Sequence, residues 1–203
     1  KQYLSTKEIV KDSSNKDVEK YTLITKVDEK NYSFVLAGDQ LFKVLTKENQ
    51  DQIKTAYETA YTDAGMKKAE GCKLSAYEIV VAEANTLANT LILNAKTALD
   101  TSLKDAQSLD STIFTADSYA ALKTVMDESS LLVQSTTSTL EQLTQELVKL
   151  DNAKKALINV SGLKAIVDQS STYVKDSYTN RSYTAYETSL NEAKQVLENG
   201  AST

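Results

Sequence analysis

The chain has 203 residues, of which 41% are hydrophobic and 25% charged, with a formal net charge of −5. This composition supports packed cores and argues against a disordered chain. Acidic and basic residues are interspersed without the basic stripe that neutralises phosphates, so we expect no nucleic-acid partner. No apolar run approaches the roughly 20 residues that span a bilayer, which predicts no membrane insertion in this segment. The first residues are polar and do not resemble a signal peptide.

The chain has no histidine and one cysteine, Cys72. It therefore lacks the commonest general base and metal ligand, and a lone thiol normally needs a histidine partner to act as a nucleophile. We interpret Cys72 as a small apolar residue beside a strand. Carboxylate pairs such as Glu141 with Glu146 are expected on solvated helix faces, with lysines such as Lys149 nearby. No calcium loop, glycine-rich phosphate cradle or Gly-x-Ser-x-Gly elbow occurs, so the sequence predicts no catalytic residues, no cofactor and no metal site.

The first quarter of the chain is predicted to form strands. Residues 1–18 are polar and lysine-rich, and we expect a frayed lead-in or a short edge element there. Residues 21–27, 32–36 and 41–45 are rich in β-branched and aromatic side chains with period-two alternation, which predicts three strands in a meander.

The hydrophobic period then changes to that of a helix. Apolar residues recurring at i, i+3, i+4, i+7 and i+8 predict a helix from about 46 to 64, with Gly65 as its C-terminal stop. Residues 74–81 are predicted to return to the sheet as a strand. Residues 1–83 are thus expected to form a small α+β domain with the order β-β-β-α-β, in which one helix packs on one face of the sheet.

Beyond residue 83 the pattern is helical throughout, so the chain is expected to be mostly helical overall. A first helix is predicted from about 87 to 106, and a second begins after Thr115, whose hydroxyl is expected to cap it while Asp117 lies where the helix dipole favours negative charge. The third helix carries leucines in the spacing of a bundle seam: Leu140, Leu143, Leu147, Leu150 and Leu157. Residues 84–160 are therefore predicted to form a three-helix bundle repeat.

Residues 161–203 are predicted to form a second, incomplete helical repeat. Apolar spacing continues past Val160, so the third helix of the first repeat is expected to run on into this segment, weakened only at Gly162. A further helix is capped by Thr179 and reaches Leu197. Because two helices cannot bury a three-helix core, either the chain is a fragment of a longer protein or this end packs differently.

Two stretches, one beginning at Phe114 and the other at Tyr178, share an aromatic-Thr-x-x-Ser-Tyr signal followed by an apolar stripe. They are Phe114-Thr115-Ala116-Asp117-Ser118-Tyr119 and Tyr178-Thr179-Asn180-Arg181-Ser182-Tyr183. The second continues as x-x-Tyr186-x-x-x-Leu190-x-x-Ala193-x-x-Val196-Leu197 and resembles the FIVAR module. The first copy departs from that pattern, since Phe114 stands for Tyr178, Leu122 for Tyr186 and Ser129 for Ala193.

FIVAR modules are three-helix units that occur in tandem in cell-wall-attached proteins of Gram-positive bacteria and are appended to secreted glycoside hydrolases. The resemblance covers residues 85–203. It implies extracellular display, adhesion or spacing, and it carries over no catalytic residue.

Tyrosine is over-used, with eleven copies against three phenylalanines and no tryptophan. Tyrosine rings stack on sugars or anchor protein interfaces while the hydroxyl stays solvated. The candidate ligand contacts are two tyrosines on one predicted helix face, Tyr57 and Tyr61, and a cluster in the second repeat, Tyr173, Tyr178, Tyr183 and Tyr186. The alternative is that tyrosines at helical spacing pack a core and expose only their rims.

Together these features favour a non-catalytic region of a bacterial cell-wall-associated protein, in which helical repeats hold or extend an adhesive head. An alternative is that the modules are accessory, glycan-contacting or linker modules of a secreted carbohydrate-active enzyme. A third hypothesis makes the α+β domain an independent enzyme. The first two predict an extracellular location, cell-wall associated or secreted, and a host or cell-wall glycan or protein as the partner.

Overall fold

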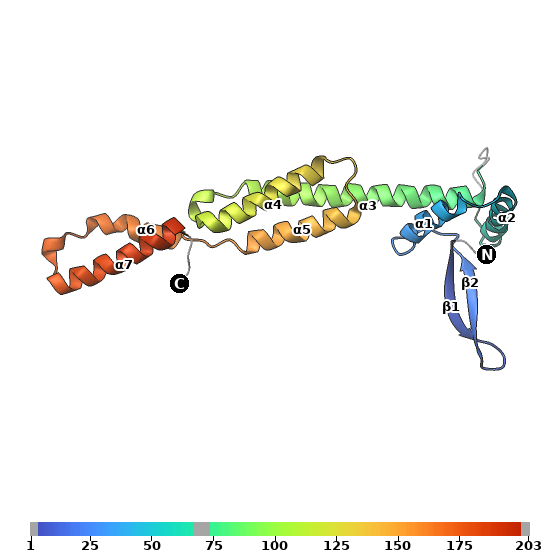
Figure 1. The fold of residues 1–203 in the computed structure, drawn as a ribbon, viewed down its shortest axis with the longest axis horizontal. Coiled ribbons are helices and arrows are strands. Elements are labelled where there is room, and N and C mark those ends of the chain that lie inside the picture. Colours follow the sequence, from blue (N-terminus) through green and yellow to red (C-terminus); the bar gives the residue numbers. More distant parts are fainter. Residues whose placement is uncertain (1–3, 67–73, 200–203) are drawn as a thin grey trace. The chain divides into compact units, whose positions relative to one another are not determined.

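The structure is a computed structural model that describes residues 4–66 and 74–199, and Cys72 lies outside these ranges. The chain divides into two compact units, which we call unit 1 (Lys1–Leu91) and unit 2 (Ile92–Thr203). The described residues form seven α-helices and one two-stranded antiparallel sheet (Figure 1). The predicted helical majority is confirmed, while the three-part division at residues 83 and 160 stays a prediction.

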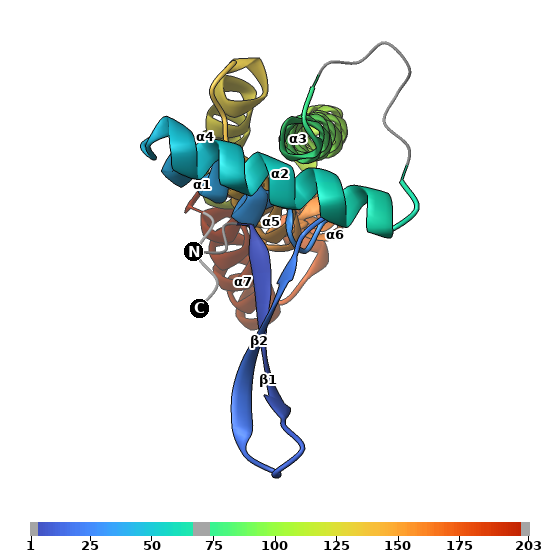
Figure 2. The same cartoon turned by 90° about the vertical axis from the view of Figure 1, so that its right-hand side faces the viewer.

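Unit 1 begins with a β-hairpin, β1 (Ser5–Lys11) and β2 (Asp17–Leu23), whose two strands lie side by side in both views (Figures 1 and 2). The turn is built around Asp12, whose carboxylate accepts hydrogen bonds from the backbone N–H groups of Ser14 (2.8 Å) and Lys16 (3.0 Å). Of the two alternatives for residues 1–18, the short edge element is therefore the one found, since the described part contains β1, the turn and the start of β2. Its side chains are mostly exposed, so no apolar alternation announces it.

The predicted meander is wrong after β2. Residues 32–36 and 41–45, expected to be strands, belong to or follow helix α1 (Tyr32–Phe42). The helix starts at a polar turn in which the Asp28 carboxylate accepts from the N–H groups of Lys30 (2.9 Å) and Asn31 (3.1 Å). Such side-chain bonds to backbone favour a turn over a strand.

The buried side of α1 explains why the alternation misled. Val35, Gly38 and Phe42 are buried, at i, i+3 and i+7, whereas Phe34 is 49% exposed. The helical period therefore describes which residues enter the core, and the period-two alternation of the aromatic residues was incidental.

Helix α2 (Lys47–Asp63) is confirmed, with Thr46 accepting a cap bond from the Asn49 N–H and Gly65 ending the segment at φ +73. The strand predicted at residues 74–81 is wrong. That segment contains the first turns of α3 (Ala76–Gln107), which open with a reciprocal cap between Ser75 and Glu78. The predicted β-β-β-α-β order is therefore replaced in unit 1 by two strands, two helices and the start of a third helix.

The core of unit 1 is centred on Leu4, which is 1% exposed. Tyr57 donates a hydrogen bond from its hydroxyl to the Leu4 carbonyl (2.6 Å). A Cβ at Gly38 would lie 1.8 Å from Leu4 Cδ2, so only glycine lets Leu4 enter beside α1. Side chains from both helices and the start of α3 complete the cluster, including Val35, Phe42, Ile53, Tyr77 and Val80.

Unit 2 contains the rest of α3, a 3-10 turn (Ser111–Ile113), α4 (Ala116–Gln134) and α5 (Leu140–Lys155). The predicted cap is confirmed, since Thr115 Oγ1 accepts from the Ser118 N–H, and Thr139 forms a capping box with Gln142. These three helices share one buried cluster, made by Leu99, Leu103, Ala106, Leu122, Met126, Leu143 and Leu150.

The run-on of the third helix past residue 155 is wrong. Residues 156–160 leave α5 and return toward the start of α4, where Thr115 N donates to the Ile158 carbonyl (3.0 Å) and Val160 N donates to the Ile113 carbonyl (2.8 Å). Val160 is buried by this closure, so its apolar character serves the joint and does not extend the helix.

A new helix, α6 (Ser161–Gln169), follows, then 3-10 turns at Ser170–Thr172 and Lys175–Ser177, and finally α7 (Asn180–Asn199). Helices α6 and α7 lie side by side as a hairpin (Figure 1).

Candidate functional site

The two candidate tyrosines of unit 1 are core residues. Tyr57 is fully buried and packs edge-on against the Tyr77 ring, with centroids 5.4 Å apart. Tyr61 is 7% exposed and donates to Glu83 Oε1 (3.3 Å). Burial raises the pKa of both phenols above the ordinary value of a tyrosine. The core-packing alternative therefore describes both rings.

The other four candidate tyrosines lie together on α7 and on the turns between α6 and α7, and line an open groove of about 530 Å³. We call it the tyrosine groove. Its other lining residues are mainly apolar and come from both helices, including Ile166, Val167, Leu190 and Ala193. The structure therefore brings together four of the six candidate tyrosines. Sequence reasoning missed three other lining residues, Ile166, Gln169 and Ser189.

The four rings form a connected cluster around Tyr186. Its centroid lies 5.4 Å from that of Tyr173 and 5.9 Å from that of Tyr183, and Tyr173 lies 6.3 Å from Tyr178. The ring planes are tilted by 54° to 57°, so the cluster presents both faces and edges. Tyr173 and Tyr178 are 47% and 48% exposed, which leaves ring surface open to a partner.

Two polar contacts fix the cluster. The Tyr186 hydroxyl donates to the Ser170 carbonyl (3.3 Å), which ties α7 to the turn after α6. The Lys175 ammonium lies 5.6 Å from the Tyr183 ring centroid, a cation–π distance. Two rings of α7 are thus held by residues of the turns between α6 and α7.

The local sequence explains why the groove-lining residues of α7 lie on one side of the helix. Tyr183, Tyr186, Leu190 and Ala193 follow the helical period and share one side. The predicted Thr179 cap is confirmed: its hydroxyl oxygen accepts from the Ser182 N–H at 3.3 Å and lies 2.8 Å from Ser182 Oγ.

The start of α4 has the same arrangement at the equivalent place of the first copy. Thr115 Oγ1 accepts from the Ser118 N–H at 3.4 Å and donates to Ser118 Oγ at 2.8 Å. We call the sequence separation between Thr115 and Thr179 the repeat offset. The 3-10 turns before the two helices, Ser111–Ile113 and Lys175–Ser177, are related by the same offset. The sequence repeat is therefore also a repeat of local backbone and capping geometry.

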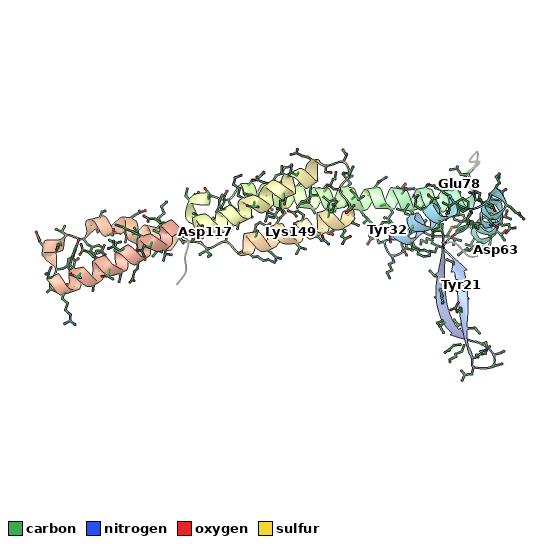
Figure 3. The ribbon with its side chains drawn as sticks, in the orientation of Figure 1. Tyr21, Tyr32, Asp63, Glu78, Asp117 and Lys149 are labelled. Carbon is green, nitrogen blue, oxygen red and sulfur yellow. The ribbon has the colours of Figure 1, made fainter. Side chains whose placement is uncertain are left out.

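The two copies differ in what covers them. In the first, α5 lies over α3 and α4, and its Glu146 is only 2% exposed, which corrects the expectation of a solvated carboxylate. Glu146 accepts from Ser129 Oγ (3.1 Å) and from Lys149 Nζ (3.1 Å), and this bond to Glu146 raises the pKa of Lys149, which is labelled in Figure 3. In the second copy, none of the described side chains of residues 161–198 is buried.

The chemistry open to the tyrosine groove is recognition by ring faces, hydroxyls and apolar surface. Among residues 4–66 and 74–199, no group of histidine, cysteine, aspartate and glutamate is placed to hold a metal ion. Within the same ranges, no helix has both the length and the apolar character needed to cross a bilayer.

No family model matches this chain, and no solved structure matches it. The FIVAR resemblance therefore remains a hypothesis that depends on the motif residues themselves.

Proposed function

We propose that this chain is a non-catalytic region of a bacterial cell-wall-associated protein, in which serial helical repeats hold or extend an adhesive part. In this proposal residues 84–160 are one three-helix repeat of FIVAR type and residues 161–203 are an incomplete copy. The observation that carries it is the turn, cap and helix that recur at the repeat offset.

Repeated helical units suit a spacer because each unit contacts mainly its neighbours, so length is gained by adding copies. Two features of the joint between the copies support this role. Two backbone hydrogen bonds link residues 158 and 160 to residues 115 and 113, so the segment that follows α5 is held against the start of α4 in the same copy. The next copy then begins at once, with α6 starting at Ser161.

Surface location is tested on intact cells of the source organism. We expect antibodies raised against residues 92–199 to label unpermeabilised cells, and external protease to remove the signal. Labelling that appears only after lysis would rule out the proposed location, while a cytoplasmic protein assayed in parallel controls for leakage.

A second function, glycan contact by an accessory module of a secreted enzyme, is favoured by the half-exposed rings of Tyr173 and Tyr178. Tyrosine faces provide stacking surfaces for sugar rings. We expect Tyr173→Ala and Tyr178→Ala to abolish binding on a glycan array, whereas Tyr21→Ala, which removes a ring of 43% exposure on β2 outside the groove (Figure 3), leaves it unchanged. An array without signal for the unmodified chain would eliminate this function.

A further inference from the structure

The tyrosine groove corresponds to a surface that is covered in the first copy. At the repeat offset, the groove residues Ile166, Ser182 and Ala193 correspond to Ser102, Ser118 and Ser129. All three of those serines are bonded to α5 or to the residues directly after it. The groove thus marks the place that α5 takes in the first copy.

The contacts of α5 in the first copy show what such a helix provides. Leu143 and Leu150 are fully buried in the cluster shared with α3 and α4. After the helix, the Ile158 N–H donates to Ser118 Oγ at 3.2 Å. One helix and one residue after it therefore make the contacts at the equivalent surface.

We infer that the tyrosine groove binds one amphipathic partner α-helix, seated on α6 and α7 as α5 is seated on α3 and α4. The inference uses the repeat part of the proposed function and is independent of surface location. It names an α-helix as the occupant because the first copy presents the equivalent surface to a helix. Leucines spaced as in α5 match the apolar residues that α6 and α7 leave partly exposed.

Ser182 supplies a second, polar reason. Its Oγ lies 2.8 Å from Thr179 Oγ1 and donates to the Thr179 carbonyl at 2.9 Å, as Ser118 Oγ does with Thr115 at 2.8 and 3.1 Å. A hydroxyl oxygen has two lone pairs, so it accepts further bonds while donating. Ser182 is therefore oriented to receive the N–H of a residue that follows the partner helix, as Ser118 receives that of Ile158.

The groove also specifies how the partner helix differs from α5. Ser129, which bonds Glu146, is replaced by Ala193, and Ser102, which bonds both Asp151 (3.1 Å) and Lys154 (2.7 Å), is replaced by Ile166. A carboxylate buried against an alanine loses a hydrogen bond and keeps its desolvation cost. The partner helix accordingly carries an apolar residue at the position of Glu146.

The experiment appends residues 140–159 directly after Thr203 of the full chain. Ser202 and Thr203 repeat Ser138 and Thr139 at the repeat offset, so the added helix enters in the register of α5 with a threonine before it. Three versions of the appended helix are compared, while the chain's own α5 is left unchanged. The first has the native sequence, and the second has the substitution E146L in the appended copy. The third is a matched control in which the appended equivalents of Leu143, Leu147 and Leu150 are serine.

Hydrogen exchange and tyrosine nitration report occupancy of the groove. In the E146L version we expect amide exchange in α7 to slow by about tenfold or more, as expected when a local segment gains buried contacts. We also expect nitration of Tyr173 and Tyr178 to fall. The native α5 version is expected to protect less, and the serine control not at all, while α4 exchanges equally in all three.

Several results would overturn the inference. They are unchanged α7 exchange in the E146L version, equal protection by the serine control, or native α5 protecting as well as E146L. Protection of the tyrosines in the unmodified chain through self-association, seen by sedimentation, or by an added glycan would assign the groove to a second copy or to a sugar instead. None of these results bears on cell-surface labelling, so the location is tested separately.

Discussion

The two helical segments of unit 2 start from one local signal and reach different degrees of burial. Thr115 and Thr179 make the same set of cap contacts, each with the serine that is the third residue of the helix. Yet the segment with α4 and α5 contains fully buried leucines, whereas residues 161–198 have no buried side chain among those described. Capping needs only neighbours in sequence, but a core needs a third helix, so similar local structure does not imply similar stability.

The largest expected effect compares core residues at equivalent positions. Leu103 is 5% exposed, while its counterpart Val167 is only partly buried. We expect Leu103→Ala to cost about 2–5 kcal/mol, because it leaves a cavity, and Val167→Ala to cost less than about 1 kcal/mol. Urea unfolding followed by hydrogen exchange, with α4 and α7 read separately, measures both. Equal costs would mean that the second copy has a core of its own.

The next effect concerns the buried polar pair that distinguishes the copies. Ser129→Ala removes the donor to the Glu146 carboxylate and is expected to destabilise the first copy by about 1–3 kcal/mol. Adding Glu146→Leu removes the unsatisfied charge as well, so the double variant should recover most of the loss. A double-mutant cycle from denaturant melts gives the coupling, and additive costs would show that the pair is not coupled.

A smaller effect is expected at the caps. Thr115 is 1% exposed, so Thr115→Ala loses the cap bond where water cannot replace it, at a cost of about 1–2 kcal/mol. Thr179 is exposed, and we expect Thr179→Ala to cost about half as much. Amide exchange at the first turns of α4 and α7 measures the loss of stability that each substitution causes. A larger loss at α7 would show that burial does not strengthen the cap.

The smallest effect extends the comparison to unit 1 through pH. The Lys54 ammonium, and then the Ser75 N–H, lower the pKa of Glu78 (Figure 3) below its ordinary value of 4.5. Its contribution to stability is therefore complete above about pH 4.5 and is lost as the pH falls through the lower, folded-state pKa.

Glu78→Gln should accordingly flatten the acid side of the stability profile of unit 1 and leave that of unit 2 unchanged. Because the Glu78 side chain is 38% exposed, solvent screening keeps this contribution below about 1 kcal/mol. Circular dichroism melts between pH 6 and 3 follow it. An equal loss of stability at pH 6 and pH 3 would show that the lost hydrogen bonds, and not the charge, matter.

Sequence reasoning succeeded where the signal was local. The helix ends at Thr46, Gly65, Thr115 and Thr179 were predicted because capping and positive φ depend on a few adjacent residues. It failed at residues 32–36 and 74–81, where short apolar runs fit both a strand and a buried helix. Only packing into the core of unit 1 decides between the two, by Val35 in the first segment and by Tyr77 and Val80 in the second.

The candidate site divides in the same way. Six tyrosines were predicted from composition and spacing, and four of them line the groove. Tyr57 and Tyr61 share a helix face just as the others do, but Leu4 and the start of α3 bury them. The burial of Glu146 was equally hidden, because its partner Ser129 lies on another helix.

By itself, the sequence determined the mostly helical character, the caps, and the repeat offset that relates the two copies. The helical character and the caps depend on residues close together in the chain, and the repeat offset follows from a repeated motif. The tertiary structure decided which apolar faces are covered, since burial depends on side chains far apart in the chain. It placed α5 over the first copy and left the rings of Tyr173 and Tyr178 in the second about half exposed, and that difference is the basis for inferring a binding surface at the tyrosine groove.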